Sequence, residues 1–336
     1  AICHLPSAIC HLPSAICHLP SAICNPPSHD HTNRQKRRET PPMPELPDVV
    51  VYLERLEALV GRRHLLRIRV ASPWVLRTFD PPVTAVERKR VVGFRTIGKR
   101  LVIALEDDLF VVIHLMIAGR LRLRPPGTLI PAKRGLAAFD FSDATFLLTE
   151  EGTQRRASIH IVRGEEALDK HDRGGVEPFA MTVAQLGGAL RRERHTLKRA
   201  LTDARLISGI GGTYADEIMH RAKLSPIVHT DKLVDDDIER LHAATRAVLT
   251  EWTDRLRKEV GDGFPEKVTA FHDQMAVHGK FGKPCPVCGA PVQRIVYSSN
   301  ETNYCPGCQT GGKILADRAL SRLLKEDFPR KLEDLE

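Results

Sequence analysis

Two Cys-X-X-Cys pairs near the C-terminal end constrain the folding of this 336-residue chain more than any other local feature. Sixteen residues separate the pair Cys285 and Cys288 from the pair Cys305 and Cys308. Pairs at this distance can fold back so that four thiolates surround one Zn²⁺ tetrahedrally. A hairpin of this size does not fold without its metal. We therefore predict one structural zinc ion whose four positions are all filled by cysteine, which leaves the metal no catalytic role.

The other four cysteines lie in a repetitive leader, and the segment from Asn25 to Pro284 has none. The first 28 residues repeat with a period of seven, as AICHLPS three times and then AICNPPS. A proline in every unit rules out a continuous helix. We interpret residues 1–42 as a disordered leader that is not part of the mature protein, and Met43 as the true start. The lack of a disulfide framework in the body favours a reducing compartment.

The composition favours an anionic partner. A formal net charge of +8 and a pI near 9.1 make a polyanion such as nucleic acid the first partner to consider, although many basic proteins bind none. The apolar content of 42 % is enough for the cores of two domains. No apolar run approaches the ~20 residues that cross a bilayer, so we expect no membrane partner.

Hydrophobic periodicity divides the chain after Met43 into a sheet region and a helical region. Apolar residues of Leu46–Val60 fall on one face of a helix that Gly61 ends. Short alternating or apolar runs then predict an antiparallel sandwich. The runs are Leu66–Val70, Leu101–Leu105, Leu109–Ala118, Leu121–Leu123, Phe139–Phe141, Thr145–Thr149 and Ser158–Val162. After Gly174 the period becomes helical, and the predicted helices are Val183–Arg192, Leu197–Thr202, Tyr214–Ala222, Asp235 to about Val260 and Ile314–Leu324.

Pro44 and Glu45 combine a potential nucleophile with an acid. Without Met43, Pro44 carries a free secondary amine, which can attack an electrophilic carbon and become a Schiff base while the carboxylate moves protons. A peptide-bonded proline nitrogen has lost its lone pair to resonance and cannot do this. The alternative is that proline and an acidic residue simply start a helix.

Two further segments are candidates for binding phosphate. Gly209-Ile-Gly211-Gly212 precedes a predicted helix, where backbone N–H groups can converge on an anion. The surrounding arginines indicate a DNA phosphate, and a flexible turn on a solvated basic face is the alternative. Lys99, in a Gly-Lys pair before a buried strand, either touches a phosphate or reacting sugar or simply faces solvent.

The order of these features resembles the formamidopyrimidine-DNA glycosylase/endonuclease VIII family of DNA base-repair enzymes. Met43-Pro-Glu-Leu-Pro-Asp48 opens the domain, Gly98-Lys99 precedes one strand, and His114-Leu115 lies in the next. Gly209-Ile-Gly211 then precedes Tyr214-Ala-Asp-Glu217, and the four-cysteine finger follows. The resemblance covers residues 43–312 and rests on an ordered combination of motifs.

The resemblance implies an α+β multidomain fold. It has an N-terminal antiparallel β-sandwich with a leading helix, a C-terminal helix–two-turns–helix domain and a zinc finger. The expected divisions are the leader 1–42, a catalytic sandwich over 43–175, the helix–two-turns–helix domain over 176–278, the finger over 279–312 and a helical extension over 313–336. Double-stranded DNA would lie between the domains, with the damaged nucleotide flipped out of the stack.

The resemblance also implies roles for individual residues. Pro44 would attack C1′ of the flipped deoxyribose and displace an oxidised base, Glu45 would act as acid and base, and Lys99 would position a phosphate. The Schiff base would then allow the strand to be cut, so the implied enzyme is a monomeric bifunctional DNA glycosylase and abasic-site lyase. The implied DNA contacts are Ile117, Arg155, Arg156, Lys198, Gly211 and Gly212.

Several DNA-holding positions depart from the family pattern. Ile117 stands where the family has an intercalating methionine, and an apolar wedge can still fill the gap of the flipped base. Alternatively Met116 could be re-aimed, although neighbours on a strand point to opposite faces. Three further departures are Ala157 for a phenylalanine, Gly212 for an asparagine and Asn300 for an arginine of the finger.

Three functions stay open at this point. The favoured one is the glycosylase/lyase, acting on oxidised purines such as 8-oxoguanine and formamidopyrimidines or on oxidised pyrimidines. The alternative is a damage-binding protein that keeps the scaffold without turnover, which the altered DNA contacts favour. An unrelated zinc-ribbon DNA binder ranks last because it leaves Pro44 and Glu45 unexplained. The expected location is the cytoplasm and nucleoid in a bacterium and the nucleus in a eukaryote.

Overall fold

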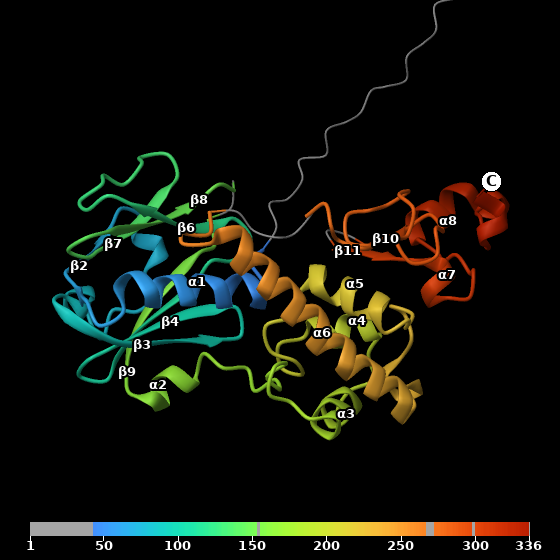
Figure 1. Cartoon of the computed structure of the whole chain (residues 1–336), viewed down its shortest axis with the longest axis horizontal. Helices are drawn as coiled ribbons and strands as arrows, with labels where there is room; N and C mark the ends of the chain where they lie inside the picture. The colour runs from blue at the N-terminus through green and yellow to red at the C-terminus, as the bar shows by residue number, and fades with distance from the viewer. Residues whose placement is uncertain (1–42, 153–154, 267–271, 298–299, 336) are drawn as a thin grey trace, which may run out of the picture. The chain divides into compact units, whose positions relative to one another are not determined.

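The computed structural model describes residues 43–152, 155–266, 272–297 and 300–335, so the leader predicted over residues 1–42 lies outside the described residues. Two antiparallel sheets form the N-terminal part (Figure 1). One has the strand order β1-β3-β4-β5-β9 and the other β2-β7-β8-β6. The strands are β1 (His64–Leu65), β2 (Arg67–Val70), β3 (Lys89–Ile97), β4 (Arg100–Leu105), β5 (Leu109–His114), β6 (Gly119–Arg124), β7 (Gly135–Asp140), β8 (Thr145–Glu150) and β9 (Ser158–Arg163).

Side chains of both sheets meet in one core, which makes this part the predicted β-sandwich. Ile103 and Ile113 contribute from the first sheet, Phe146 and Leu148 from the second, and Tyr52 from the leading helix α1 (Leu46–Val60). The other face of the first sheet is also buried, because a second cluster forms beneath α2 (Glu165–Asp169). Burial on both faces explains the nearly continuous apolar runs of β4 and β5.

The strand prediction differs from the structure at several places, since it omits β1 and begins β7 at Phe139 rather than at Gly135. β5 ends at His114 rather than at Ala118, because residues 116–118 form a turn in which Met116 has a φ of 55°. The apolar run misled the prediction since Ala118 is also buried, at 3 % exposure. β3 is not predicted at all, because charged residues and Gly93 interrupt its alternation.

The C-terminal part holds the predicted helices and a hairpin. Its helices are α3 (Val183–Arg191), α4 (Leu197–Thr202), α5 (Gly212–Arg221) and α6 (Asp235–Val260). The hairpin β10 (Gln293–Tyr297) and β11 (Asn300–Tyr304) is followed by α7 (Pro306–Gln309) and α8 (Arg318–Leu324). The last helix is shorter than the predicted Ile314–Leu324, because Ile314 and Leu315 are buried in a segment without regular secondary structure before it.

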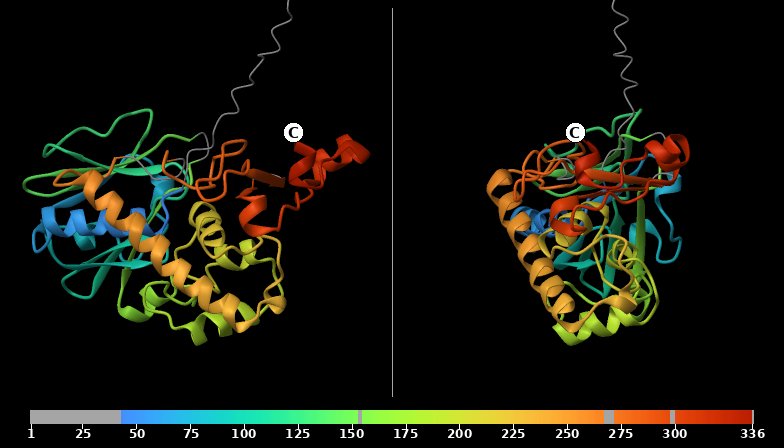
Figure 2. Two further views of the ribbon diagram at one scale, coloured as in Figure 1. Left: turned by 45° about the vertical axis from the view of Figure 1, so that its right-hand side comes forward. Right: turned by 90° about the vertical axis from the view of Figure 1, so that its right-hand side faces the viewer.

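Helix α6 links the helical part to the sandwich, and the left view of Figure 2 shows it extending from one to the other. Apolar residues along it, such as Leu249 and Trp252, join the core of the helical part. Just beyond its end, Phe264 packs against Tyr52 and Phe146 with ring centroids 5.5 and 5.2 Å apart. The helix and the segment that follows it therefore contact both cores.

The start of α1 also lies in the helical core. Leu46 is 2 % exposed and belongs to the cluster formed by α3 to α6, and its N–H donates a 3.1 Å hydrogen bond to the carbonyl of Gly209. Gly209 has a φ of 76°, and a Cβ added there would lie 3.0 Å from the Cβ of Leu46. The close approach of these two segments requires glycine.

We therefore expect Gly209→Ala to lower the free energy of unfolding by about 1–2 kcal/mol. Alanine is strained in the left-handed backbone conformation of this position, and its Cβ would crowd Leu46. The matched control is Gly188→Ala on α3, where an added Cβ meets nothing within 4 Å. That change should raise stability by about 0.4–1 kcal/mol. Urea unfolding of both variants measures whether each substitution raises or lowers the free energy of unfolding. A stabilising Gly209→Ala would contradict the packing of Leu46 against Gly209.

Candidate active site and metal centre

Glu45 is a buried carboxylate at the beginning of α1. It is 4 % exposed, and its own N–H donates to Asp48 Oδ2 over 2.9 Å. Pro44, immediately before it, is also buried. The dipeptide therefore does start a helix, as the structural alternative predicted, and its carboxylate also accepts hydrogen bonds from the beginning of another helix.

The Glu45 carboxylate binds the N-terminus of α5. Backbone N–H groups donate to it from Gly211 over 2.7 Å, from Thr213 over 2.9 Å and from Tyr214 over 3.3 Å. The positive end of a helix dipole and free N–H groups favour an anion here. The anion is the protein's own glutamate, so the prediction that the Gly211 amide holds a DNA phosphate is corrected. A DNA contact at Gly212 stays a prediction.

Lys99 lies beside this carboxylate, on the turn between β3 and β4. A Cβ added at Gly211 would collide with Lys99 Nζ and lie 2.5 Å from Glu45 Cδ, so the glycine leaves room for both side chains. Burial lowers the pKa of Lys99, while the negative charges of Glu45 and Asp48 act in the opposite direction. Three segments that are far apart in the sequence thus bring together Glu45, Lys99 and Gly211.

A cavity of about 160 Å³ opens next to Lys99. Met43, Lys99, Arg100, His114 and Arg173 are among the residues that line it. Burial, with the nearby charges of Arg100 and Lys99, lowers the pKa of His114 to about 4, so this imidazole is neutral at pH 7. The cavity therefore presents basic side chains and a neutral histidine at the point where the chain enters Pro44.

Ile117 lies in the turn between β5 and β6. The turn is held by Gly119 N–H donating to the Leu115 carbonyl over 2.9 Å and by Arg120 Nη1 donating to the Ile117 carbonyl over 3.1 Å. Met116 and Ile117 are both half-buried. The objection that neighbours on a strand face opposite sides does not apply, since both residues are in a turn. Which of them enters DNA stays a prediction.

Arg155 and Arg156 are exposed in the loop after β8. Arg155 Nη2 donates to the Lys133 carbonyl over 2.7 Å, and the backbone N–H of Arg156 donates to the Glu150 carboxylate over 2.9 Å. Ala157, at the position of the missing phenylalanine, is 3 % exposed in the sandwich core. The DNA contacts of the two arginines stay predictions.

Lys198 is held in a buried ion-pair network at the beginning of α5. Its Nζ lies 2.5 Å from both the Gly212 carbonyl and Asp216 Oδ1. Asp216 is fully buried, and its other oxygen lies 2.8 Å from His278 Nδ1. Lys198 is thus positioned at the predicted DNA-binding loop, although much of its hydrogen-bonding capacity is used within the protein.

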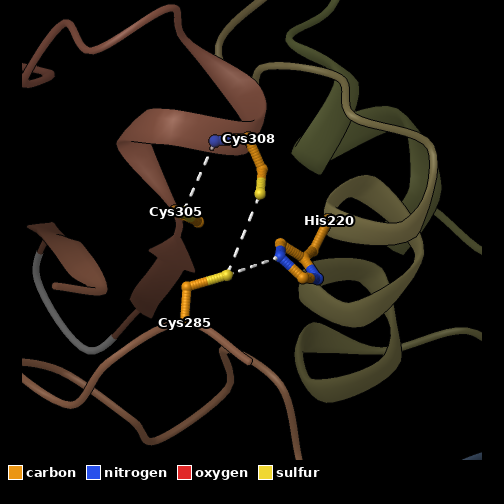
Figure 3. A group of neighbouring side chains, drawn as sticks. All are labelled: His220, Cys285, Cys305 and Cys308. Carbon is orange, nitrogen blue, oxygen red and sulfur yellow. Dashed lines mark hydrogen bonds between the residues drawn. The ribbon is translucent and has the colours of Figure 1, made fainter. Parts of the chain in front are cut away.

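Three of the four predicted zinc ligands, Cys285, Cys305 and Cys308, come together in one group at the finger (Figure 3). The fourth, Cys288, lies beside Cys305. Cys285 Sγ lies 3.8 Å from Cys308 Sγ, and Cys288 Sγ lies 3.3 Å from Cys305 Sγ. With Zn–S bonds of about 2.3 Å, the sulfur–sulfur edges of a ZnS₄ tetrahedron are about 3.8 Å long. The residues present therefore fit one structural zinc ion, as the spacing predicts.

Sequence reasoning missed two buried groups on α5, Glu217 and His220. Glu217 accepts backbone N–H groups from Ala276, Val277 and His278, each over 2.9 Å, and burial raises its pKa. His220 lies against the finger, with Nε2 3.3 Å from Cys285 Sγ. The sequence does show a cluster of polar residues on one helix, which could have indicated these groups. The sequence pattern around them does not reveal that their side chains are buried.

In the part of the chain that the structure describes, no helix combines the length and the apolar character needed to span a bilayer.

Family domain models match three parts of the chain. The N-terminal domain of formamidopyrimidine-DNA glycosylase matches residues 43–157, the H2TH domain of formamidopyrimidine-DNA glycosylase matches residues 175–258, and a zinc finger found in FPG and IleRS matches residues 282–311. A 151-residue "uncharacterized formamidopyrimidine-DNA glycosylase-like" match in Mycobacterium tuberculosis is 40 % identical and covers 45 % of this chain and 94 % of that protein.

Solved structures share the fold over most of the chain. A mutant FPG of Lactococcus lactis in complex with DNA that contains Fapy-dG superimposes with a TM-score of 0.70 at 23 % identity, covering 80 % of this chain and 100 % of that one, which shows the fold. The MutM (Fpg) protein of Thermus thermophilus superimposes with a TM-score of 0.66 at 31 % identity, covering 79 % of this chain and 98 % of that one.

The Thermus thermophilus formamidopyrimidine-DNA glycosylase is 33 % identical over 282 residues, which cover 80 % of this chain and 100 % of that enzyme. Together with the shared fold and the matched domains, this similarity shows that the chain belongs to the formamidopyrimidine-DNA glycosylase family.

Proposed function

We propose that this protein is a bifunctional DNA glycosylase and abasic-site lyase that excises oxidised bases from double-stranded DNA. The observation that carries the proposal is the convergence of Glu45, Lys99 and the N-terminus of α5 directly beside Pro44. Glu45 is fixed by three backbone N–H groups, which orient its carboxylate without help from substrate. Family membership supports the same activity.

In the proposed reaction the Pro44 nitrogen bonds to C1′ of the damaged nucleotide. The glycosidic bond breaks, and its electron pair leaves with the base, which takes up a proton. We assign two proton transfers to Glu45: it takes up the proton that the Pro44 nitrogen loses on bonding to C1′, and it passes that proton to O4′. The sugar ring then opens, and the bond between C1′ and the nitrogen becomes an iminium. The iminium ion then acidifies the C2′ hydrogen, and loss of that proton expels the 3′ phosphate and cuts the strand.

The amine chemistry requires an active form that begins at Pro44. An α-amino group has an ordinary pKa of about 8, so an unprotonated fraction exists at neutral pH. In the 336-residue chain the Pro44 nitrogen is instead acylated by Met43, which lines the cavity beside Lys99. Removal of residues up to Met43 would expose the amine at that cavity.

The lesion is proposed only as a class. Solved relatives from Lactococcus lactis are described in complex with DNA that contains Fapy-dG, an abasic site or an oxidised pyrimidine. We include both oxidised purines and oxidised pyrimidines, because Ala157 is buried and offers no aromatic ring to the duplex. A damage-binding protein without turnover is the second candidate, and the departures at Gly212 and Asn300 favour it.

Borohydride trapping tests the nucleophile. Protein processed to begin at Pro44 should form a covalent adduct with duplex DNA that contains an abasic site, because reduction fixes the iminium. The matched control is the intact 336-residue chain, with its N-terminus verified by mass spectrometry. Its Pro44 nitrogen is in a peptide bond with Met43, so it should give no adduct. Equal trapping by both forms would refute the role of Pro44, and binding without any adduct would favour the damage-binding protein.

Glu45→Gln tests the acid and base. The amide keeps the shape but cannot move a proton, so we expect single-turnover base release to fall by about 10²–10⁴-fold. Glu217→Gln is the control, since Glu217 is another buried carboxylate that accepts three backbone N–H groups but does not touch Lys99. Its base release should stay close to that of the unchanged protein. Equal losses in both variants would mean that Glu45 acts through structure alone.

A further inference from the structure

His220 lies at the metal centre but comes from the helical part, near the end of α5 (Figure 3). Its side chain is 6 % exposed, and its ligand atom lies within 4.8 Å of the sulfurs of Cys285, Cys305 and Cys308. With Cys288, five candidate donors surround the place of an ion that takes four ligands. One of the five must therefore interact with a ligand and not with the metal.

Cys288 has the stronger case as the fourth ligand. Its Sγ lies 3.3 Å from that of Cys305, which is within the range of a shared metal. In both pairs a backbone N–H donates to the first sulfur, from Val287 to Cys285 over 3.5 Å and from Cys308 to Cys305 over 3.4 Å. The donor is two residues after the sulfur in the first turn and three residues after it in the second, and both turns direct a backbone N–H at their first cysteine.

The remaining candidate, His220, can supply a hydrogen-bond donor, which a buried cluster of thiolates needs. Four thiolates around Zn²⁺ carry a net charge of −2, and Cys285 and Cys305 are only 2 % and 0 % exposed. N–H donors to sulfur spread such charge, and partners of this kind orient metal ligands. His220 Nε2, 3.3 Å from Cys285 Sγ, is at hydrogen-bonding distance for an imidazole N–H to a sulfur.

Neighbouring contacts show that α5 is the surface on which the finger docks. The backbone N–H of Asn303 donates to Asp216 over 3.1 Å, and Gln309 Nε2 donates to the Leu224 carbonyl just after α5 over 2.9 Å. His220 lies between these two positions in the sequence. On this docking surface, His220 contacts a predicted zinc ligand, Cys285.

We propose that His220 is an outer-sphere positioning residue of the zinc site: its Nε2–H donates a hydrogen bond to the Cys285 thiolate and thereby couples zinc binding to docking of the finger on α5. The inference concerns the metal site and stands independently of the proposed catalytic role of Pro44 and Glu45.

Zinc competition with a chromophoric chelator tests the proposal on the full chain. His220→Phe should raise the dissociation constant for zinc by about 10–100-fold, the usual loss when an outer-sphere partner is removed. His220→Gln, which keeps an N–H at similar reach, should recover part of that loss. His242→Phe on α6, whose histidine contacts the Met181 carbonyl over 2.9 Å, is the control and should leave zinc affinity unchanged. Unchanged affinity in His220→Phe overturns the proposal.

Spectroscopy distinguishes a hydrogen-bonding histidine from a metal ligand. In the Co²⁺-loaded protein the thiolate charge-transfer intensity should be retained by His220→Phe and reduced by Cys288→Ser. In the zinc-loaded protein, long-range ¹H–¹⁵N spectra should show a protonated Nε2 on His220, which needs no variant that could misfold. A metal-bound, unprotonated Nε2, or a spectrum that changes with His220→Phe but not with Cys288→Ser, would make His220 a ligand and refute the outer-sphere role.

Discussion

The structure depends on one carboxylate that is held by another domain's helix. Glu45 comes from the first helix of the sandwich, yet all three backbone N–H groups that it accepts come from the beginning of α5. A buried carboxylate is costly unless it is hydrogen-bonded, so this interaction ties the two parts in one geometry. The adjacent Leu46–Gly209 contact closes the same junction with apolar surface and a backbone hydrogen bond.

Helix α5 organises the rest of the C-terminal part although it is only ten residues long. Its N-terminus binds Glu45, and its middle carries Asp216 and Glu217, which hold Lys198, His278 and the backbone before the finger. Its last turn presents His220 to Cys285. One short helix therefore connects the candidate catalytic carboxylate to the metal centre, and each connection is a hydrogen bond to a buried charged or metal-binding group.

The two ends of α5 lie in different electrostatic environments. At the cavity, Lys99 and Arg100 surround a neutral His114, an environment suited to the phosphates of a nucleic acid. On the finger side, N–H donors face sulfurs that carry negative charge when zinc is bound. Of the substituted positions, Ile117 lies in the turn after β5 and Ala157 in the sandwich core, whereas the carbonyl of Gly212 accepts a hydrogen bond from Lys198.

The sequence alone determined features that rest on local chemistry or short periods. The Cys-X-X-Cys spacing predicted the zinc site, and a long amphipathic pattern placed α6, whereas β3 was missed because charges interrupt its alternation. Pro44, Glu45 and Lys99 were recognised by residue type and by a family resemblance. Only the tertiary structure decided that the anion at α5 is Glu45, 166 residues before Gly211, and that His220 faces the finger. Such pairings depend on how separate elements pack, and no local pattern encodes them.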